Sequence, residues 1–184
     1  MKKLFAITAM VLFSFSGLQA QESMFNLGDK VISLGIGFGS TLFSGTYYSK
    51  GVPPVSISFE MPIIDQILEK GVIGVGGWLG YTSYKYDYLG WGYKYSNFIV
   101  GALGTFHYPL LDKLDTYVGV GLGYNIASAN EFGTYQGWDY NSTSGGVVFA
   151  GMVGARYYFV EKFAAFVQVG YGVSYLTIGV SFRL

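Results

Sequence analysis

From about residue 30 onward, apolar side chains recur at every second position, in segments separated by turn residues. In Thr116–Asn125 the pattern is regular, because from Val118 on each bulky residue is followed by a glycine or an asparagine. A period of two places alternate side chains on opposite faces of a β-strand. Glycine at every second position also disfavours a helix. The pattern therefore predicts strands with one bulky apolar face and one small or polar face.

The same pattern predicts eight strands. They cover approximately Lys30–Gly39, Pro54–Met61, Val72–Tyr84, Lys94–Tyr108, Thr116–Asn125, Gly146–Phe159, Phe163–Tyr171 and Leu176–Leu184. Most of them reach about ten residues, as a tilted strand that crosses a membrane requires. An even number of strands is typical of bacterial membrane barrels. The segment Ile63–Lys70 departs from the alternation, and its apolar positions predict a short helical turn.

The predicted connections alternate between short and long. Short turns follow the second, fourth and sixth strands, at Pro62–Gly71, Pro109–Asp115 and Val160–Lys162. Longer loops follow the first, third and fifth strands, at Ser40–Pro53, Lys85–Tyr93 and Ile126–Gly145. Short periplasmic turns and longer extracellular loops are typical of outer-membrane barrels.

The composition indicates which face of the barrel is apolar. Apolar residues make up 51% of the chain and charged residues only 12%, whereas a soluble domain has about 25% charged residues. No apolar run after residue 20 is long enough for a transmembrane helix. A soluble eight-stranded barrel is the alternative, but its bulky residues would lie inside. We therefore expect an all-β fold, a closed antiparallel eight-stranded transmembrane barrel with its bulky face in lipid.

The first twenty residues resemble a cleavable signal peptide. Lys2 and Lys3 precede the apolar run Leu4–Phe15, and Ala20 supplies a small residue at the expected cleavage site. The predicted organisation is a signal peptide at residues 1–20 and a barrel domain at residues 21–184. Removing the two lysines leaves a net charge of −2. The sequence contains no basic patch that would indicate nucleic-acid binding.

Aromatic side chains gather near both ends of the predicted strands. They are expected to form the two girdles that mark the membrane interfaces. The outer girdle is predicted at Tyr47, Tyr48, Tyr81, Tyr84, Tyr86, Tyr88, Trp91, Tyr93 and Tyr95. The inner girdle is predicted at Phe106, Tyr108, Tyr157, Tyr158, Phe159 and Phe163.

Taken together, the signal peptide, the eight alternating segments and the terminal strand Leu176–Leu184 resemble the small outer-membrane β-barrel (porin-like, OmpA/OmpX-type) family. The segments Ala155–Phe159 and Tyr117–Gly119 are similar to those of porin-family proteins from Bacteroidetes-type Gram-negative bacteria. The resemblance implies that the protein lies in the bacterial outer membrane. It also implies that outer-membrane lipids and the barrel assembly machinery are its partners.

Five polar residues are predicted to face the lumen: Glu60, His107, Arg156, Gln168 and Arg183. A narrow eight-stranded barrel encloses side chains and no wide channel. An unpaired buried charge is costly, so inward charges are expected to pair. We interpret these residues as a Glu/Arg network that plugs the lumen. The alternative is a gate or a narrow path for ions.

The predicted outer loops carry aromatic and acidic residues that suit a surface ligand. The candidates are Tyr86, Tyr88, Trp91, Trp138 and Asp139. The alternative interpretation is that these segments are hairpins that continue beyond the membrane.

The sequence offers little for catalysis. It has no cysteine, which excludes thiol chemistry and disulfides. Its single histidine, His107, has no serine in a His-x-Ser arrangement beside it. We therefore expect no cofactor, no metal and no enzyme, but a porin-like or structural outer-membrane barrel. Surface binding or adhesion through the outer loops is the alternative function, and a barrel enzyme that acts on lipid is a third.

Overall fold

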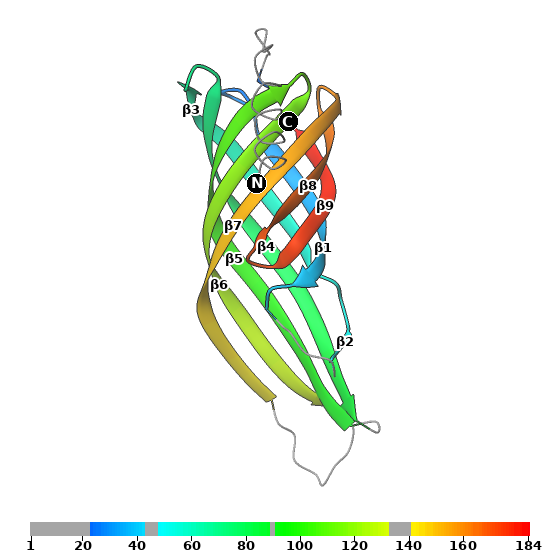
Figure 1. Ribbon diagram of the computed structural model, residues 1–184. Coiled ribbons are helices and arrows are strands. Elements are labelled where there is room, and N and C mark those ends of the chain that lie inside the picture. The colour runs from blue at the N-terminus through cyan, green and yellow to red at the C-terminus, as the bar shows by residue number, and fades with distance from the viewer. Residues whose placement is uncertain (1–22, 43–47, 89–90, 133–140) are drawn as a thin grey trace, which may run out of the picture.

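The computed structural model describes residues 23–42, 48–88, 91–132 and 141–184, which form nine strands. They are β1 (Val31–Ser40), β2 (Tyr48–Lys50), β3 (Val55–Ile67), β4 (Gly71–Tyr88), β5 (Trp91–Leu111), β6 (Leu114–Phe132), β7 (Asn141–Val160), β8 (Phe163–Tyr171) and β9 (Ser174–Arg183). Within these residues, eight strands form an antiparallel ring in the order β1-β3-β4-β5-β6-β7-β8-β9 (Figure 1). β9 pairs with β1 to close the ring, and the short β2 is added beside β4. The described residues include no helix with the length and apolar character to cross a membrane.

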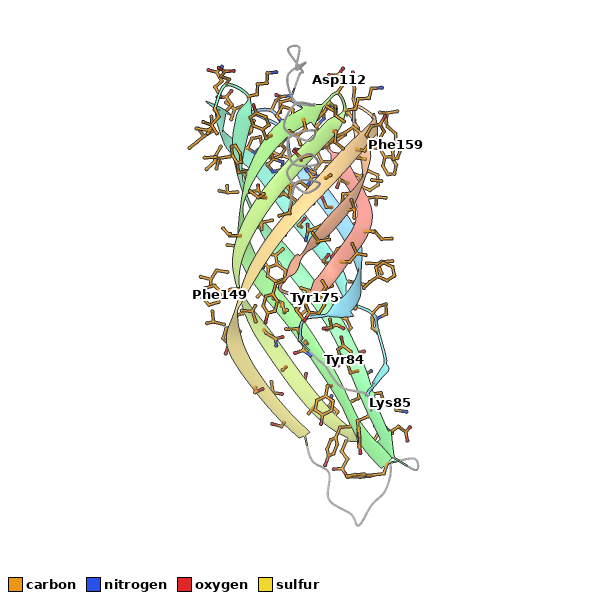
Figure 2. All side chains as sticks on the ribbon, in the orientation of Figure 1. Tyr84, Lys85, Asp112, Phe149, Phe159 and Tyr175 are labelled. Atoms are coloured by element: carbon orange, nitrogen blue, oxygen red, sulfur yellow. The ribbon has the colours of Figure 1, made fainter. Side chains whose placement is uncertain are left out.

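The outer surface of the ring is apolar. Val120 and Phe149 are 71% and 70% exposed. Figure 2 shows Phe149 and Phe159 pointing away from the barrel. Exposed apolar side chains alternate with inward glycines and small polar residues, as they do in barrels that face lipid. The prediction of a closed eight-stranded transmembrane barrel is confirmed.

The strands differ greatly in length. β4, β5, β6 and β7 contain 18, 21, 19 and 20 residues, whereas β1, β8 and β9 contain 10, 9 and 10. The long strands therefore continue well past the β8–β9 turn (Figure 1). We call their continuation the projecting sheet and define it as residues 82–88, 91–97, 127–132 and 141–144. Serine, asparagine and lysine replace apolar residues on its outer face, so it begins where the lipid-facing band ends.

Four sequence-based expectations were wrong. The predicted loop Lys85–Tyr93 is mostly strand, and much of the predicted loop Ile126–Gly145 belongs to β6 and β7. The predicted helical turn at Ile63–Lys70 is the end of β3 followed by a tight turn, in which Leu68 and Glu69 have positive φ angles. The predicted loop Ser40–Pro53 contains β2.

The aromatic girdles were predicted only in part. Tyr157 and Phe159 are exposed to the outside, as an interface girdle requires. Tyr84 and Tyr158, in contrast, are 7% and 0% exposed, because the alternation along β4 and β7 turns them inward. Tyr47 lies outside the described residues.

Apolar residues also fill the middle of the lumen. Trp78 is 7% exposed and packs with Ile99, Leu103 and Ala150, so it points inward. Met152 and Val173 cover this cluster from β7 and from the β8–β9 turn. These side chains therefore occupy the interior at this level, as expected for eight strands.

Candidate functional site

Arg156 lies inside the barrel between two carboxylates from other strands. Its Nη2 donates to Glu60 Oε1 on β3 at 3.1 Å, and its Nη1 donates to Asp115 Oδ2 on β6 at 3.1 Å. Arg156, Glu60 and Asp115 are 1%, 3% and 3% exposed. Arg156 reaches both partners because alternation turns all three inward from different parts of the ring. We call these residues, together with His107, the lumen network.

His107 on β5 completes the network. Its Nδ1 lies 2.8 Å from Asp115 Oδ1, and its Nε2 lies 3.2 Å from Glu60 Oε2. Both carboxylates thus contact both His107 and Arg156, and the four side chains link β3, β5, β6 and β7. Such a cross-linked set fixes the relative position of the strands that carry it.

Together with Thr105, His107 and Asp115 resemble a catalytic triad in geometry. The Thr105 hydroxyl lies 2.9 Å from His107 Nε2, while Nδ1 faces Asp115, as in a nucleophile–base–orienter triad. However, Glu60 Oε2 lies against the same Nε2, where a general base must accept the hydroxyl proton. Thr105 and His107 are also 4% and 1% exposed. The geometry fits a buried ion-pair network better than a nucleophile.

The chain segment before β1 covers the network at the mouth of the barrel. Phe25 is completely buried, and its ring centroid lies 4.1 Å from that of His107. It packs with Val31 and Val72 in a small apolar cluster. The mouth on this side is the end with the short β3–β4, β5–β6 and β7–β8 turns (Figure 1). The network therefore lies directly behind an aromatic cover.

Two of the sequence-predicted lumen residues lie outside the network. Gln168 faces inward from β8 and accepts a hydrogen bond from the Tyr117 hydroxyl at 3.1 Å. Arg183 does not join Glu60, which corrects the prediction. Its Nη1 donates to the Met24 carbonyl oxygen at 3.1 Å and lies 3.6 Å from Asp29 Oδ2. Arg183 lies at the end of β9, beside the segment that precedes β1, and binds that segment.

Asp115 is the network residue that sequence reasoning missed. It was assigned to the turn Pro109–Asp115, whereas β6 already begins at Leu114. The signal was present, because Asp115 lies an even number of residues before the inward glycines of the same strand. Extending the alternation by one residue would have placed its carboxylate in the lumen.

A small cavity separates the network from the Trp78 cluster. Its volume is about 60 Å³, and Glu60, Arg156, Gln168 and Trp78 line it together with serine and threonine side chains. Arg156 Nε and Trp78 Nε1 are buried without a hydrogen-bond partner among the described residues. A cavity of this size and polarity has room for a few water molecules.

Three of the candidate binding residues at the outer end lie in strands and not in loops. Tyr86 lies in β4 and Trp91 in β5, where the indole N–H donates to Glu131 Oε1 of β6 at 2.5 Å. Tyr88 is the last residue of β4. Trp138 and Asp139 lie outside the described residues. Trp91, which was assigned to a loop, thus belongs to the sheet surface.

Solved structures of outer-membrane barrels share this fold. Ail, the attachment invasion locus protein of Yersinia pestis, aligns with a TM-score of 0.54 and 15% identity over 86% of this chain and all of that chain. Its complex with the heparin analogue sucrose octasulfate aligns with a TM-score of 0.54 and 14% identity over 86% of this chain and all of that chain. The N-terminal β-barrel domain of Pseudomonas aeruginosa OprF aligns with a TM-score of 0.44 and 16% identity, over 90% of this chain and all of that chain. At these identities the likeness to Ail shows the fold.

No protein-family model matches the sequence, and no curated protein matches it either. The predicted similarity to porins of Bacteroidetes-type bacteria stays a prediction.

Proposed function

We propose that this protein is a non-enzymatic barrel of the bacterial outer membrane that is closed to solutes and binds a surface partner through its projecting sheet. The apolar exterior, the fold that it shares with Ail and the signal-peptide-like start support this location. Outer-membrane lipids and the barrel assembly machinery are then its partners in the membrane.

The lumen supports a closed barrel. The lumen network links four strands across the interior at one level, and the Trp78 cluster fills the interior at another. A small cavity of about 60 Å³ lies between them. Eight strands leave no room for a wide channel besides these side chains. We propose that the network acts as a plug and not as a path for solutes.

The observation that carries the binding function is the edge of β7. Within the described residues, Asn141–Ala150 pairs with β6 on one side and with no strand on the other, because the pairing with β8 begins at Gly151. Ten residues of strand correspond to about 33 Å of edge, of which Asn141–Ser144 lie in the projecting sheet and the rest continues toward the β8–β9 turn. An open edge of this kind presents backbone N–H and C=O groups to a further strand.

The sequence of this edge also favours pairing. Natural edge strands are commonly blocked by lysine, proline or inward charges, and none of these occurs between Asn141 and Ala150. Thr143, Ser144 and Gly145 are exposed. The name of Ail describes an attachment protein, which is consistent with surface binding by a barrel of this shape. An extended segment of another protein is therefore the proposed partner.

A strand peptide tests this proposal. A labelled peptide with the sequence of residues 141–150 is titrated against the full chain in lipid nanodiscs, and its fluorescence anisotropy is followed. We expect saturable binding, because the peptide offers the same uncharged backbone pattern to the open edge. A peptide with alternate amide nitrogens methylated is the control, since it keeps the side chains but loses the hydrogen bonds. Equal binding of both peptides, or no binding of the first, would contradict the proposal.

A further inference from the structure

The segment Ser23–Lys30, which precedes β1, is folded across the mouth of the barrel. Asn26 Nδ2 donates to the Ser23 carbonyl oxygen at 2.7 Å, and the Asn26 backbone N–H donates to Asp29 Oδ2 at 2.8 Å. These bonds close a compact turn, which aims Phe25 into the barrel. Leu27, two residues further on, is 53% exposed. The segment thus has one residue that enters the barrel and one that faces outward.

Phe25 fits a space that the strands leave for it. A Cβ atom added to Gly74 of β4 would lie 3.0 Å from the Phe25 ring, so a glycine at this position leaves room for the aromatic side chain. Val31 and Val72 complete the apolar surroundings. On its inner side the ring lies on His107, which carries the lumen network. The aromatic ring is therefore the layer between the ionised side chains and the mouth.

Arg183 fastens the segment from the other end of the chain. Its guanidinium group binds the Met24 carbonyl oxygen and lies near the Asp29 carboxylate, on both sides of Phe25 in sequence. The Leu184 backbone N–H donates to the Lys30 carbonyl oxygen at 2.9 Å. The same guanidinium group lies over the Tyr158 ring at 5.4 Å, which holds it toward the lumen. The two ends of the barrel domain are joined at this point.

We propose that Ser23–Lys30 is a strap that seals the periplasmic mouth of the barrel, with Phe25 as its stopper and Arg183 as its fastening. The strap keeps water from the lumen network, in which ion pairs are stronger than they would be in water. Its release would hydrate the network without breaking a strand pairing, because it contributes no residue to β1 or to the other strands. This inference goes beyond the binding function and does not depend on it.

The single histidine of the chain gives a direct test. The rate at which diethyl pyrocarbonate modifies His107 is measured by mass spectrometry on the full chain, folded in lipid nanodiscs. In the unaltered protein we expect slow modification. Phe25→Ala is expected to raise the rate at least about tenfold, which corresponds to about 1.4 kcal/mol less free energy holding the strap closed. Arg183→Gln is expected to raise it as well, since the fastening is lost.

Leu27→Ala is the matched control, because it removes an apolar side chain of the same strap that lies outside the mouth. An unchanged rate in this variant, together with acceleration in Phe25→Ala, supports the strap. Three results would overturn it: fast modification of the unaltered protein, no acceleration in Phe25→Ala, or equal acceleration in Leu27→Ala. Folding of each variant is checked by its shift on unheated gels. If Phe25→Ala does not fold, Arg183→Gln decides by the same criterion.

Discussion

Arg156 shows how single residues determine the interior. Without a partner, its guanidinium group would be an unpaired buried charge, which is costly. Two carboxylates from different strands pair with it. Glu60, His107 and Arg156 were identified from the sequence, because alternation reveals which face a residue is on. Alternation does not reveal which inward residues lie at the same depth along the barrel axis, since that depth depends on the tilt and register of the strands. Arg183 shares the inward face and yet binds Met24.

The balance of charge predicts the effect of removing Asp115. Asp115→Ala leaves Arg156 and His107 with Glu60 as their one carboxylate partner in the network, and breaking a buried pair in this way costs about 3–5 kcal/mol. The free energy of unfolding is measured by urea titration of the protein folded in lipid vesicles. Asp112→Ala is the control, because Asp112 is exposed in the β5–β6 turn only three residues away (Figure 2). Equal losses in the two variants would mean that the network contributes nothing specific.

At the scale of the elements, the eight strands were predictable and their ends were not. The period of two gives the strands, and turn residues mark the short turns. Beyond the lipid-facing band, however, the outer face of these strands changes from apolar to polar, as at Lys94, Ser96 and Ser128. A polar segment reads as a loop, although backbone pairing continues without interruption. The apolar residues around Ile63 and Ile67 predicted a helical turn where the structure has the end of a strand, because both can have the same composition.

The seam that closes the ring is sensitive to side-chain volume. A Cβ atom at Gly179 of β9 would collide with the Leu34 carbonyl oxygen of β1, and the Phe166 ring lies just inside. Gly179→Ala is therefore expected to destabilise the barrel by about 1–3 kcal/mol, a range typical of overpacking. Gly146→Ala is the control, because no atom lies within 4 Å of the added carbon. Unfolding of the two variants on gels of increasing temperature measures the difference, and a control that melts as early as Gly179→Ala would argue against the seam.

For the whole molecule, the fold followed from the sequence, whereas the closure of the mouth did not. Phe25 lies before the first predicted strand, in a segment with no alternation. Its burial depends on a space beside Gly74 and on a ring from β5, which are distant in sequence. Such a contact can be recognised only once the ring of strands has been assembled.

The proposed closure of the lumen predicts that the protein conducts no ions. The unaltered protein, refolded in a planar bilayer, is expected to carry no steady current, because the network and the Trp78 cluster both fill the interior. Glu60→Ala alone leaves the Trp78 cluster in place, so Glu60→Ala combined with Trp78→Ala, which removes a side chain from each filled level, is expected to produce measurable current. Glu161→Ala, which alters an exposed carboxylate in the β7–β8 turn, is expected to stay silent. Steady current through the unaltered protein would show that the network lines a path and does not plug it.

The unequal strand lengths make one side of the barrel longer than the other. β8, β9 and β1 end near the middle of the molecule in Figure 1, while β4–β7 continue past them to its lower end on the opposite side. The open edge of β7 faces the side where the shorter strands β8, β9 and β1 end. A partner can therefore reach the β7 edge from one side of the barrel only. Rotation of the barrel about the membrane normal changes the direction in which this edge faces. In a crowded membrane, other membrane proteins can lie against the side formed by β1, β8 and β9 and block access to the edge. The number of barrels available for binding would then depend on these neighbouring proteins as well as on the total number of barrels.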